Sequence, residues 1–141
     1  MATDLLLSEE TKKRTTMNAI QDANPRVREK AVFDLVRSVG DVDDAIVAVA
    51  NALHDEDIDV CRQAAASLFT FGPRARIVLP SLITALQHAD LTIRRAAAAT
   101  LSLIGPEASI ALPSLRQLEQ DPDELLRVWV HAALQAIGDR P

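Results

Sequence analysis

The stretch LTIRRAAAATLSLIGPEA, residues 91–108, decides the fold because it contains a helix together with its stop signal. Four consecutive alanines, 96–99, favour a helix and carry almost no side chain, so neighbouring helices can approach closely on more than one side. Gly105 can adopt the left-handed conformation that ends a helix, and Pro106 cannot continue one. The stretch therefore predicts one helix of a tight stack.

The rest of the chain repeats this helix every 33 residues, which is the separation of Val27 and Val60. Within one copy, three apolar positions lie at i, i+4 and i+8, which places them on one face of the helix. The three apolar columns are Val27, Val60, Ile93 and Leu126; Ala31, Ala64, Ala97 and Val130; and Leu35, Leu68, Leu101 and Leu134. Each copy is expected to end at one of the four glycines of the chain, which are Gly40, Gly72, Gly105 and Gly138.

A second helix is expected after each glycine, again with an apolar stripe. Pro80 and Pro113 are also separated by one full repeat, and each should start or kink the main part of this second helix. Such a shared kink would bend every layer of the stack alike. The stripes are Ile46, Val49 and Leu53; Leu79, Leu82 and Leu86; and Leu112, Leu115 and Leu118.

Half repeats are expected at the two ends of the chain. Residues 9–21 match a second helix, with Ser8 as its N-cap, and residues 125–138 match a first helix that lacks a partner. An unpartnered helix exposes its apolar stripe, so a homodimer through 125–138 is a further expectation. We predict one domain of about eight helices: half repeat 1–21, repeats 22–54, 55–87 and 88–120, and terminal half repeat 121–141.

Composition narrows the class of protein. The 141 residues contain 48% hydrophobic and 3% aromatic residues, and no alternating pattern typical of strands occurs. One cysteine, Cys61, excludes an internal disulfide and fits a reducing compartment. The apolar triplet at 5–7 is too short for a signal peptide or a membrane span, so we expect a cytoplasmic protein without membrane contact.

Charge is unevenly distributed along the chain. The formal net charge is −5, yet residues 41–61 carry seven carboxylates and no Lys or Arg, whereas residues 62–118 are mildly basic. A general nucleic-acid binder should be basic, so the total opposes that role. An acidic region beside a mildly basic one is therefore expected on the surface.

The turn before each first helix has a recognisable pattern. It is DANPRVR at 22–28, DEDIDVC at 55–61, HADLTIR at 88–94 and DPDELLR at 121–127. These turns resemble the D-x-D-x-x-V-R turn of the HEAT-repeat family, and the IGPEA…LPSL segment at 104–115 is similar to HEAT-like repeats of the phycobilisome-lyase type. The resemblance covers nearly the whole chain and implies an all-α, right-handed α-α superhelix.

The family resemblance also implies a ladder of Asp and Arg side chains between layers. Asp22 with Arg28 and Asp121 with Arg127 keep both members of the pattern. Cys61 replaces an Arg, and His88 replaces an Asp, so we predict a ladder that is broken in the middle.

No catalytic, cofactor-binding or metal-binding residue is predicted. Asp55, Asp57 and Asp59 alternate as in a calcium loop, but Val60 and Ala66 stand where that loop needs Gly and Glu. His54, His88 and His131 are not followed by Glu, so the His-Glu pairs with which HEAT-like deoxyhypusine hydroxylases bind iron are missing. His54 and His88 could approach each other, but two ligands make a poor metal site. We therefore expect a protein that is not an enzyme.

Two single residues carry alternative interpretations. For Cys61 we favour a buried residue that replaces the arginine of the ladder. The alternative is a thiol that acts on a bilin, and Arg62 could lower the pKa of that thiol. Trp129, the only tryptophan, is favoured as a cover for the open end of the stack over an interface anchor.

The resemblance implies a protein-binding scaffold or adaptor whose second helices line a concave face. Short polar side chains there would accept a helix or an extended peptide. An acidic rim of Asp43, Asp44, Asp55 and Asp57 would favour a partner with basic residues. The predicted protein-binding residues are Asp44, Ala48, Asn51, His54, Asp55, Ser81, Thr84, Gln87, His88, Ser114, Gln117 and Gln120.

Two other functions remain open at this point. One is a bilin or chromophore lyase, which the HEAT-like variety suggests, although Tyr is missing and Phe is scarce. The other is a DNA-binding module resembling HEAT-like alkylpurine glycosylases. A small basic patch for DNA would consist of Arg74, Arg76, Arg94 and Arg95, against the net charge of −5.

Overall fold

The computed structural model describes residues 2–37 and 42–138, with side chains from Ser8 onward, and these residues contain helices and turns but no strand. The α-helices are α1 (Ala2–Ala19), α2 (Pro25–Leu35), α3 (Val42–Asn51), α4 (Ile58–Phe71), α5 (Leu79–Ala85), α6 (Leu91–Ile104), α7 (Leu112–Gln117) and α8 (Glu124–Ile137). Three 3₁₀ segments connect them, at Ala52–His54, Gly72–Val78 and Gly105–Ala111.

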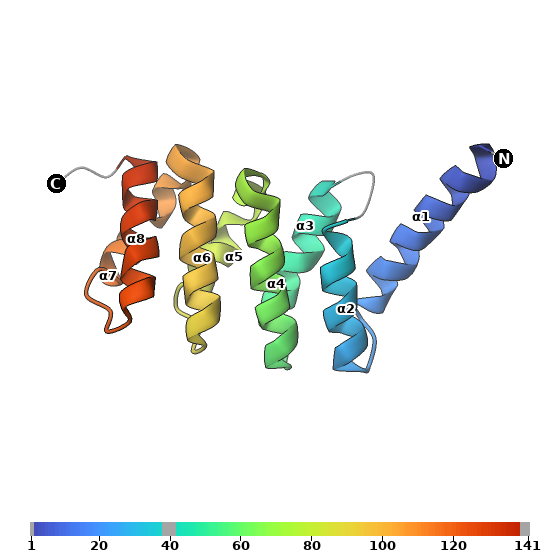
Figure 1. The fold of residues 1–141 in the computed structure, drawn as a ribbon, viewed down its shortest axis with the longest axis horizontal. Coiled ribbons are helices and arrows are strands. Elements are labelled where there is room, and N and C mark those ends of the chain that lie inside the picture. Colours follow the sequence, from blue (N-terminus) through green and yellow to red (C-terminus); the bar gives the residue numbers. More distant parts are fainter. Residues whose placement is uncertain (1, 38–41, 139–141) are drawn as a thin grey trace.

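The helices form a stack of layers (Figure 1). The first helix of each repeat lies in one row, α2, α4, α6 and α8, here called the A helices. The second helices, here called the B helices, are α3, α5 and α7, and they lie behind that row. Neighbouring A helices pack on one another along the whole row. Helix α1 precedes α2 and diverges from the stack toward its N-terminal end (Figure 1).

Among the described residues, six helices have ten or more residues, instead of the about eight helices expected. The other two, α5 and α7, have only seven and six residues, because the B helices of the second and third repeats are not continuous. Gly72 and Gly105 end α4 and α6 with positive φ, and each begins a 3₁₀ segment of seven residues whose second residue is a proline. The short helices α5 and α7 then begin with Pro80 and Pro113 in their first turns, as the spacing predicts. The stop expected at Gly40 lies outside the described residues, and the right-handed sense of the superhelix stays a prediction.

The D-x-D turn works as a double cap at the start of every A helix. The side chains of Asn24, Asp57, Asp90 and Asp123 accept backbone N–H groups at the four helix starts. Each of these residues is in turn held through its own N–H, which donates to the side chain two residues earlier. The four holding bonds are to Asp22 (2.8 Å), Asp55 (2.9 Å), His88 Nδ1 (3.0 Å) and Asp121 (2.9 Å). His88 therefore does the work of the expected aspartate.

The ion-pair ladder between layers is continuous, so the predicted break in the middle is wrong. In the middle layers the arginine stands one position later than the family pattern places it, and it reaches the N-cap aspartate of the next A helix. The rungs are Arg28–Asp55 (2.9 Å), Arg62–Asp90 (2.6 Å) and Arg95–Asp123 (2.6 Å). Because the last two rungs join partners at the same separation in the sequence, the sequence contained a signal for them.

Cys61 substitutes for an arginine in a different bond. Arg28, Arg94 and Arg127 each donate from Nη1 to the carbonyl oxygen six residues earlier, at 2.7–2.8 Å. The buried Sγ of Cys61 donates to the equivalent carbonyl, that of Asp55, at 2.9 Å. Burial raises the pKa of the Cys61 thiol, and the charges of Asp55 and Asp57 add to the rise. The thiol is therefore a structural donor and not a reactive thiolate.

The apolar columns form the core, with one exception. Val60, Ile93 and Leu126 are fully buried, whereas Val27 in the same column is 36% exposed. The stripe of α8 is buried against its own chain, and its residues Leu126, Val130 and Leu134 are at most 6% exposed. This stripe therefore offers no dimer surface, although Leu125 and Val128 on the same helix are 47% and 55% exposed, and the homodimer stays a prediction.

One stretch, Leu91–Gln117, is apolar and long enough to cross a membrane by length and composition. It folds as α6, a 3₁₀ segment and α7, which turns back along the stack, and half of its most apolar window is buried. It therefore forms no continuous helix of the roughly 20 residues that a bilayer requires.

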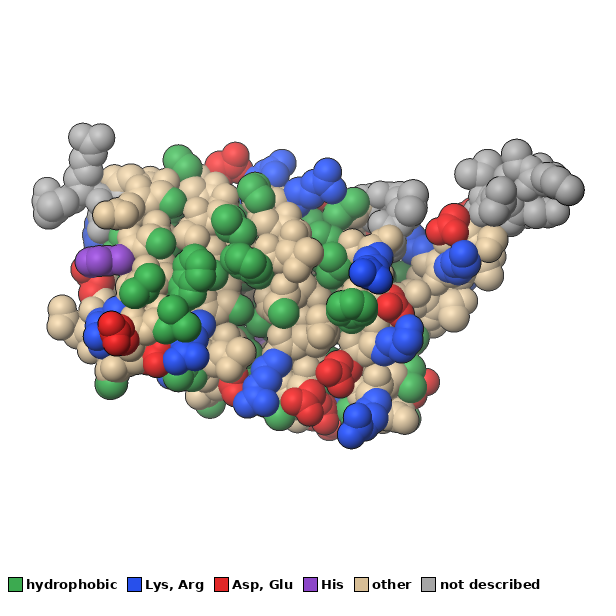
Figure 2. All heavy atoms as spheres, in the orientation of Figure 1, with side chains coloured by type: hydrophobic (Ala, Val, Ile, Leu, Met, Phe, Trp, Pro, Cys, Tyr) green, Lys and Arg blue, Asp and Glu red, His purple; other side chains and the backbone are tan. Residues whose placement is uncertain are grey.

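The alanine run lets two aromatic rings meet across α6. Phe69 on α4 and Trp129 on α8 contact edge to face, with ring centroids 6.4 Å apart. Helix α6 lies between α4 and α8 (Figure 1), and Ala96, which stands one repeat before Trp129, has only a small side chain at the corresponding position. Hydrophobic side chains gather over the middle of the A row (Figure 2). Trp129 thus covers α6, and not the open end of the stack as expected.

Candidate functional site

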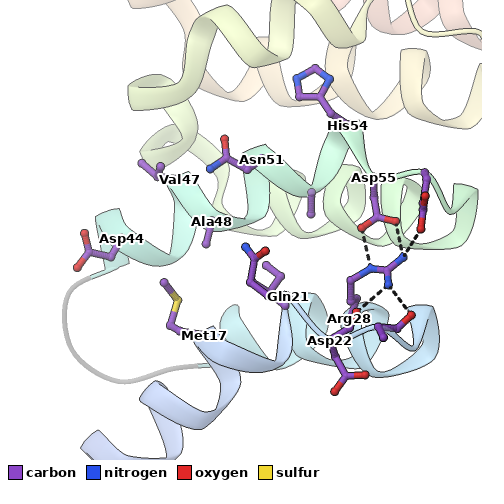
Figure 3. Close-up of a pocket in the computed structure, with 14 residues that line it drawn as sticks. Met17, Gln21, Asp22, Arg28, Asp44, Val47, Ala48, Asn51, His54 and Asp55 are labelled. Atoms are coloured by element: carbon purple, nitrogen blue, oxygen red, sulfur yellow. Dashed lines mark hydrogen bonds and ion pairs between the residues drawn. The ribbon is translucent and has the colours of Figure 1, made fainter.

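A cavity of about 840 Å³ lies between the end of α1, the start of α2, and α3 (Figure 3). It opens because α1 diverges from the stack. Five of the predicted protein-binding residues line it: Asp44, Ala48, Asn51, His54 and Asp55.

Apolar and amide side chains form the walls of this first cavity. Met17 and Ile20 come from the α1 side, and Val47 comes from α3 opposite. Gln21 extends from the end of α1 toward α3, and Asn51 lines the cavity from α3 (Figure 3). The cavity therefore offers apolar contact together with amide donors and acceptors, which suits a peptide segment with one apolar side chain.

The rim is acidic, and Asp44 is the expected rim residue that presents an exposed carboxylate to the cavity, together with residues that were not expected. Arg28 donates two hydrogen bonds to Asp55, and this contact lowers the pKa of the Asp55 carboxyl. Asp57 caps α4 and is also engaged within the chain. Asp22, Asp44 and Glu56 present exposed carboxylates, so the lining carries a formal charge of −3 once Arg28 and Asp55 are included.

A second cavity of about 200 Å³ follows along the B helices. His54 lines both cavities and joins them. His54 and His88 line this second cavity together, which agrees with the predicted approach of the two residues. No group of three or more potential metal ligands gathers among the described residues. The predicted residues in this cavity are His54, Ser81, Thr84, Gln87 and His88.

The third repeat does not continue this joined groove. Ser114 and Gln117 lie on α7, and Gln120 lines a separate pocket of about 410 Å³ with Arg127 and His131. Nine of the twelve predicted residues thus share the joined groove. Met17, Ile20 and Val47 were missed, because they become neighbours only through the angle at which α1 leaves the stack.

The predicted basic patch is largely committed to contacts within the chain. Arg76 lies 3.2 Å from Glu107, and Arg95 forms a ladder rung. Arg94 donates to two backbone carbonyls. Only Arg74 of the four is without a recorded ion pair or hydrogen bond among the described residues, so the charge available for a nucleic acid is small.

Solved structures with a similar fold come from several kinds of protein. The CpcE–CpcF complex of phycocyanin lyase from Nostoc sp. PCC7120 is similar at 25% identity and a TM-score of 0.69, over 89% of this chain and 53% of that one. An engineered protein is similar at 20% identity and a TM-score of 0.70, over 89% of this chain and 62% of that one. Human deoxyhypusine hydroxylase in complex with glycerol is similar at 24% identity and a TM-score of 0.69, over 89% of this chain and 43% of that one.

These neighbours contradict the expectation that the protein is not an enzyme. A phycocyanin lyase and a hydroxylase share the fold, so the fold gives no ground for excluding catalysis. The chain spans about half the length of these solved neighbours. No curated protein sequence matches closely enough to add a relative. A family profile described as HEAT repeats matches residues 46–135, which is more than half of the sequence, and the chain therefore belongs to the HEAT-repeat family.

Proposed function

We propose that this HEAT-repeat protein binds a segment of another protein in the joined groove along its first two B helices. The observation that carries the proposal is the groove itself: two cavities that share His54, with apolar walls at one end and hydroxyl and amide groups at the other. A short apolar anchor would occupy the first cavity beside Val47, and polar backbone groups would meet Asn51 and Gln87.

A bound segment with basic residues fits the rim. Asp44 and Glu56 have exposed carboxylates at the mouth of the first cavity. Complementary charge speeds the encounter of two proteins more than it tightens the final complex. The CpcE–CpcF complex, in which a similar fold assembles with another chain, supports a protein as the partner.

The test is affinity capture followed by measurement of binding with the purified partner. Asn51→Arg would place a long charged side chain in the first cavity, and Ala66→Arg would place the same side chain on an exposed position of α4 away from the groove. We expect Asn51→Arg to weaken binding about tenfold or more, and Ala66→Arg to leave it unchanged. Equal binding of both variants would show that another surface holds the partner.

A second candidate function is part of a bilin lyase, which the likeness to the CpcE–CpcF complex favours. The apolar walls of the first cavity, Met17, Ile20 and Val47, would contact the chromophore. Cys61 would have no covalent role, because it is buried and its pKa is raised. Mixing the protein with a bilin should then shift the visible absorption band, and Val47→Glu should remove the shift. An unchanged spectrum would leave the protein-binding proposal standing alone.

A further inference from the structure

A groove of about 570 Å³ between α1 and α2 has the shape of a packing surface for an A helix, and no described helix of the chain packs there. It lies on a different side from the joined groove and is lined by Lys12, Thr16, Ala19, Val27 and Ala31 among others. The residues one repeat after these five are buried in the layer that α2 covers, and none is more than 8% exposed: Ala45, Val49, Ala52, Val60 and Ala64. Of the counterparts of the other lining residues, Ala48 and Gln63 are half-buried and Asp44, at the edge of the layer, is exposed.

Val27 is exposed because it lines this groove, on which no described helix packs. Val60 stands one repeat later and is fully buried in the layer where α2 packs on α4, whereas Val27 is 36% exposed. The groove therefore reproduces the surface on which an A helix packs, with small side chains at its floor. Its natural occupant is a helix that matches the A helices of this stack.

Helix α8 has the arginine that such an occupant needs. Each A helix has two adjacent positions at which an arginine can stand, and the family pattern uses the first. Where the second of these positions is an arginine, it forms the rung, as Arg62 and Arg95 do. Helix α2 has Glu29 at that position, and the first arginine, Arg28, forms the rung. Helix α8 resembles α2, because it has Val128 at the second position and Arg127 at the first.

Arg127 is already held in the orientation of Arg28. Both donate from Nη1 to two carbonyl oxygens of their own turn, at 2.7–3.1 Å. Arg28 uses its Nε and Nη2 for Asp55, whereas no carboxylate pairs with these atoms of Arg127 among the described residues. At the other end of the stack, Asp22 occupies the place of Asp55 and is exposed, without an ion pair in the described part of the chain.

We propose that α8 of one copy packs into the groove between α1 and α2 of a second copy, so that Arg127 pairs with Asp22 of the second copy. In this contact Arg127 takes the place that Arg28 has within the stack, and Asp22 of the second copy takes the place of Asp55. The groove has apolar side chains such as Val27 beside polar ones such as Thr15, and α8 exposes Leu125 (47%) and Val128 (55%). The contact thus buries apolar surface around the Arg127–Asp22 pair. Salt weakens the contribution of that ion pair, and the head-to-tail geometry adds copies in series instead of closing a dimer.

Sedimentation velocity of the purified protein over a concentration series tests this contact. The wild type is expected to shift from monomer to larger species as its concentration rises to about 0.5 mM, and less so at high salt. Asp22→Asn keeps the side-chain oxygen that accepts from Asn24 but removes the charge, and it should weaken the association about tenfold. Thr15→Arg fills the groove and should abolish the association. Asn18→Arg, on α1 but outside the groove lining, is its matched control.

Two results would overturn the proposal. The first is a wild-type protein that stays monomeric over the whole concentration range. The second is association that Thr15→Arg and Asp22→Asn leave unchanged, because the contact would then use another face. Circular dichroism of each variant shows that the helices are retained.

Discussion

Individual side chains connect the layers of this stack through carboxylates. The aspartates Asp55, Asp90 and Asp123 each hold a helix start or turn and also accept an arginine from the preceding layer. Hydrogen bonds from arginine lower the pKa of all three, and the pKa of Asp123 falls to about 2. The negative forms of these residues are therefore favoured in the folded state.

This pKa predicts how stability depends on pH. The unfolded chain binds a proton at Asp123 near pH 3.8, whereas the folded chain binds it only near pH 2. The stabilising contribution of Asp123 is thus fully present above about pH 4 and is lost as the pH falls toward 2. Urea unfolding should show that Asp123→Asn, which keeps a side-chain oxygen for the cap, is less stable than the wild type at pH 7. The difference should shrink between pH 4 and pH 2.5.

The matched control for this experiment is Glu10→Gln, an exposed carboxylate on α1 outside the ladder. It should follow the wild type at every pH. A constant difference between Asp123→Asn and the wild type at all pH values would mean that the lost stability does not come from the Asp123 charge.

At the scale of single helices, the sequence was informative about A helices and less so about B helices. Gly105 marks the end of α6 at Ile104, as predicted, because only glycine easily takes the positive φ found there. The 3₁₀ segments were not predicted. Apolar periodicity records which side chains face the core, and over so short a segment it does not distinguish i+3 from i+4 hydrogen bonding.

Close packing of A helices depends on alanine at positions such as Ala98, which is fully buried on α6. Ala98→Leu adds three carbons where no space exists, so we expect a loss of about 1–3 kcal/mol of unfolding free energy. Ala66→Leu on the exposed side of α4 should change it by less than about 0.5 kcal/mol. Chemical denaturation of both variants measures the difference. Equal effects would show that the alanine run is not a packing requirement.

At the scale of the whole molecule, the site depended on features that no repeat contains. The period of the repeat placed Asn51 and Thr84 on one surface, and both line the joined groove. The angle of α1 was not predictable from the repeat. Helix α1 packs on α2, and no described helix packs on its other side to fix its direction. Met17 and Ile20 enter the first cavity only through that angle.

The same asymmetry predicts unequal stability along the stack. A repeat protein opens most easily where a repeat has one neighbour, and both α1 and α8 stand at ends. Helix α8 is nevertheless fastened by the Arg95–Asp123 rung and by the contact of Trp129 with Phe69, whereas α1 diverges from the stack. Hydrogen–deuterium exchange measured by mass spectrometry should therefore be fastest in α1, slower in α8 and slowest in α6.

The variant Trp129→Ala separates these contributions. It removes the ring that crosses α6, so exchange in α8 should rise toward that of α1, while exchange in α2 should not change. The measurement belongs at a low protein concentration, where copies do not associate and the groove between α1 and α2 stays unfilled. Protection of α1 equal to that of α6 under these conditions would contradict the prediction. It would mean that α1 is held by contacts other than those of the end of an open stack.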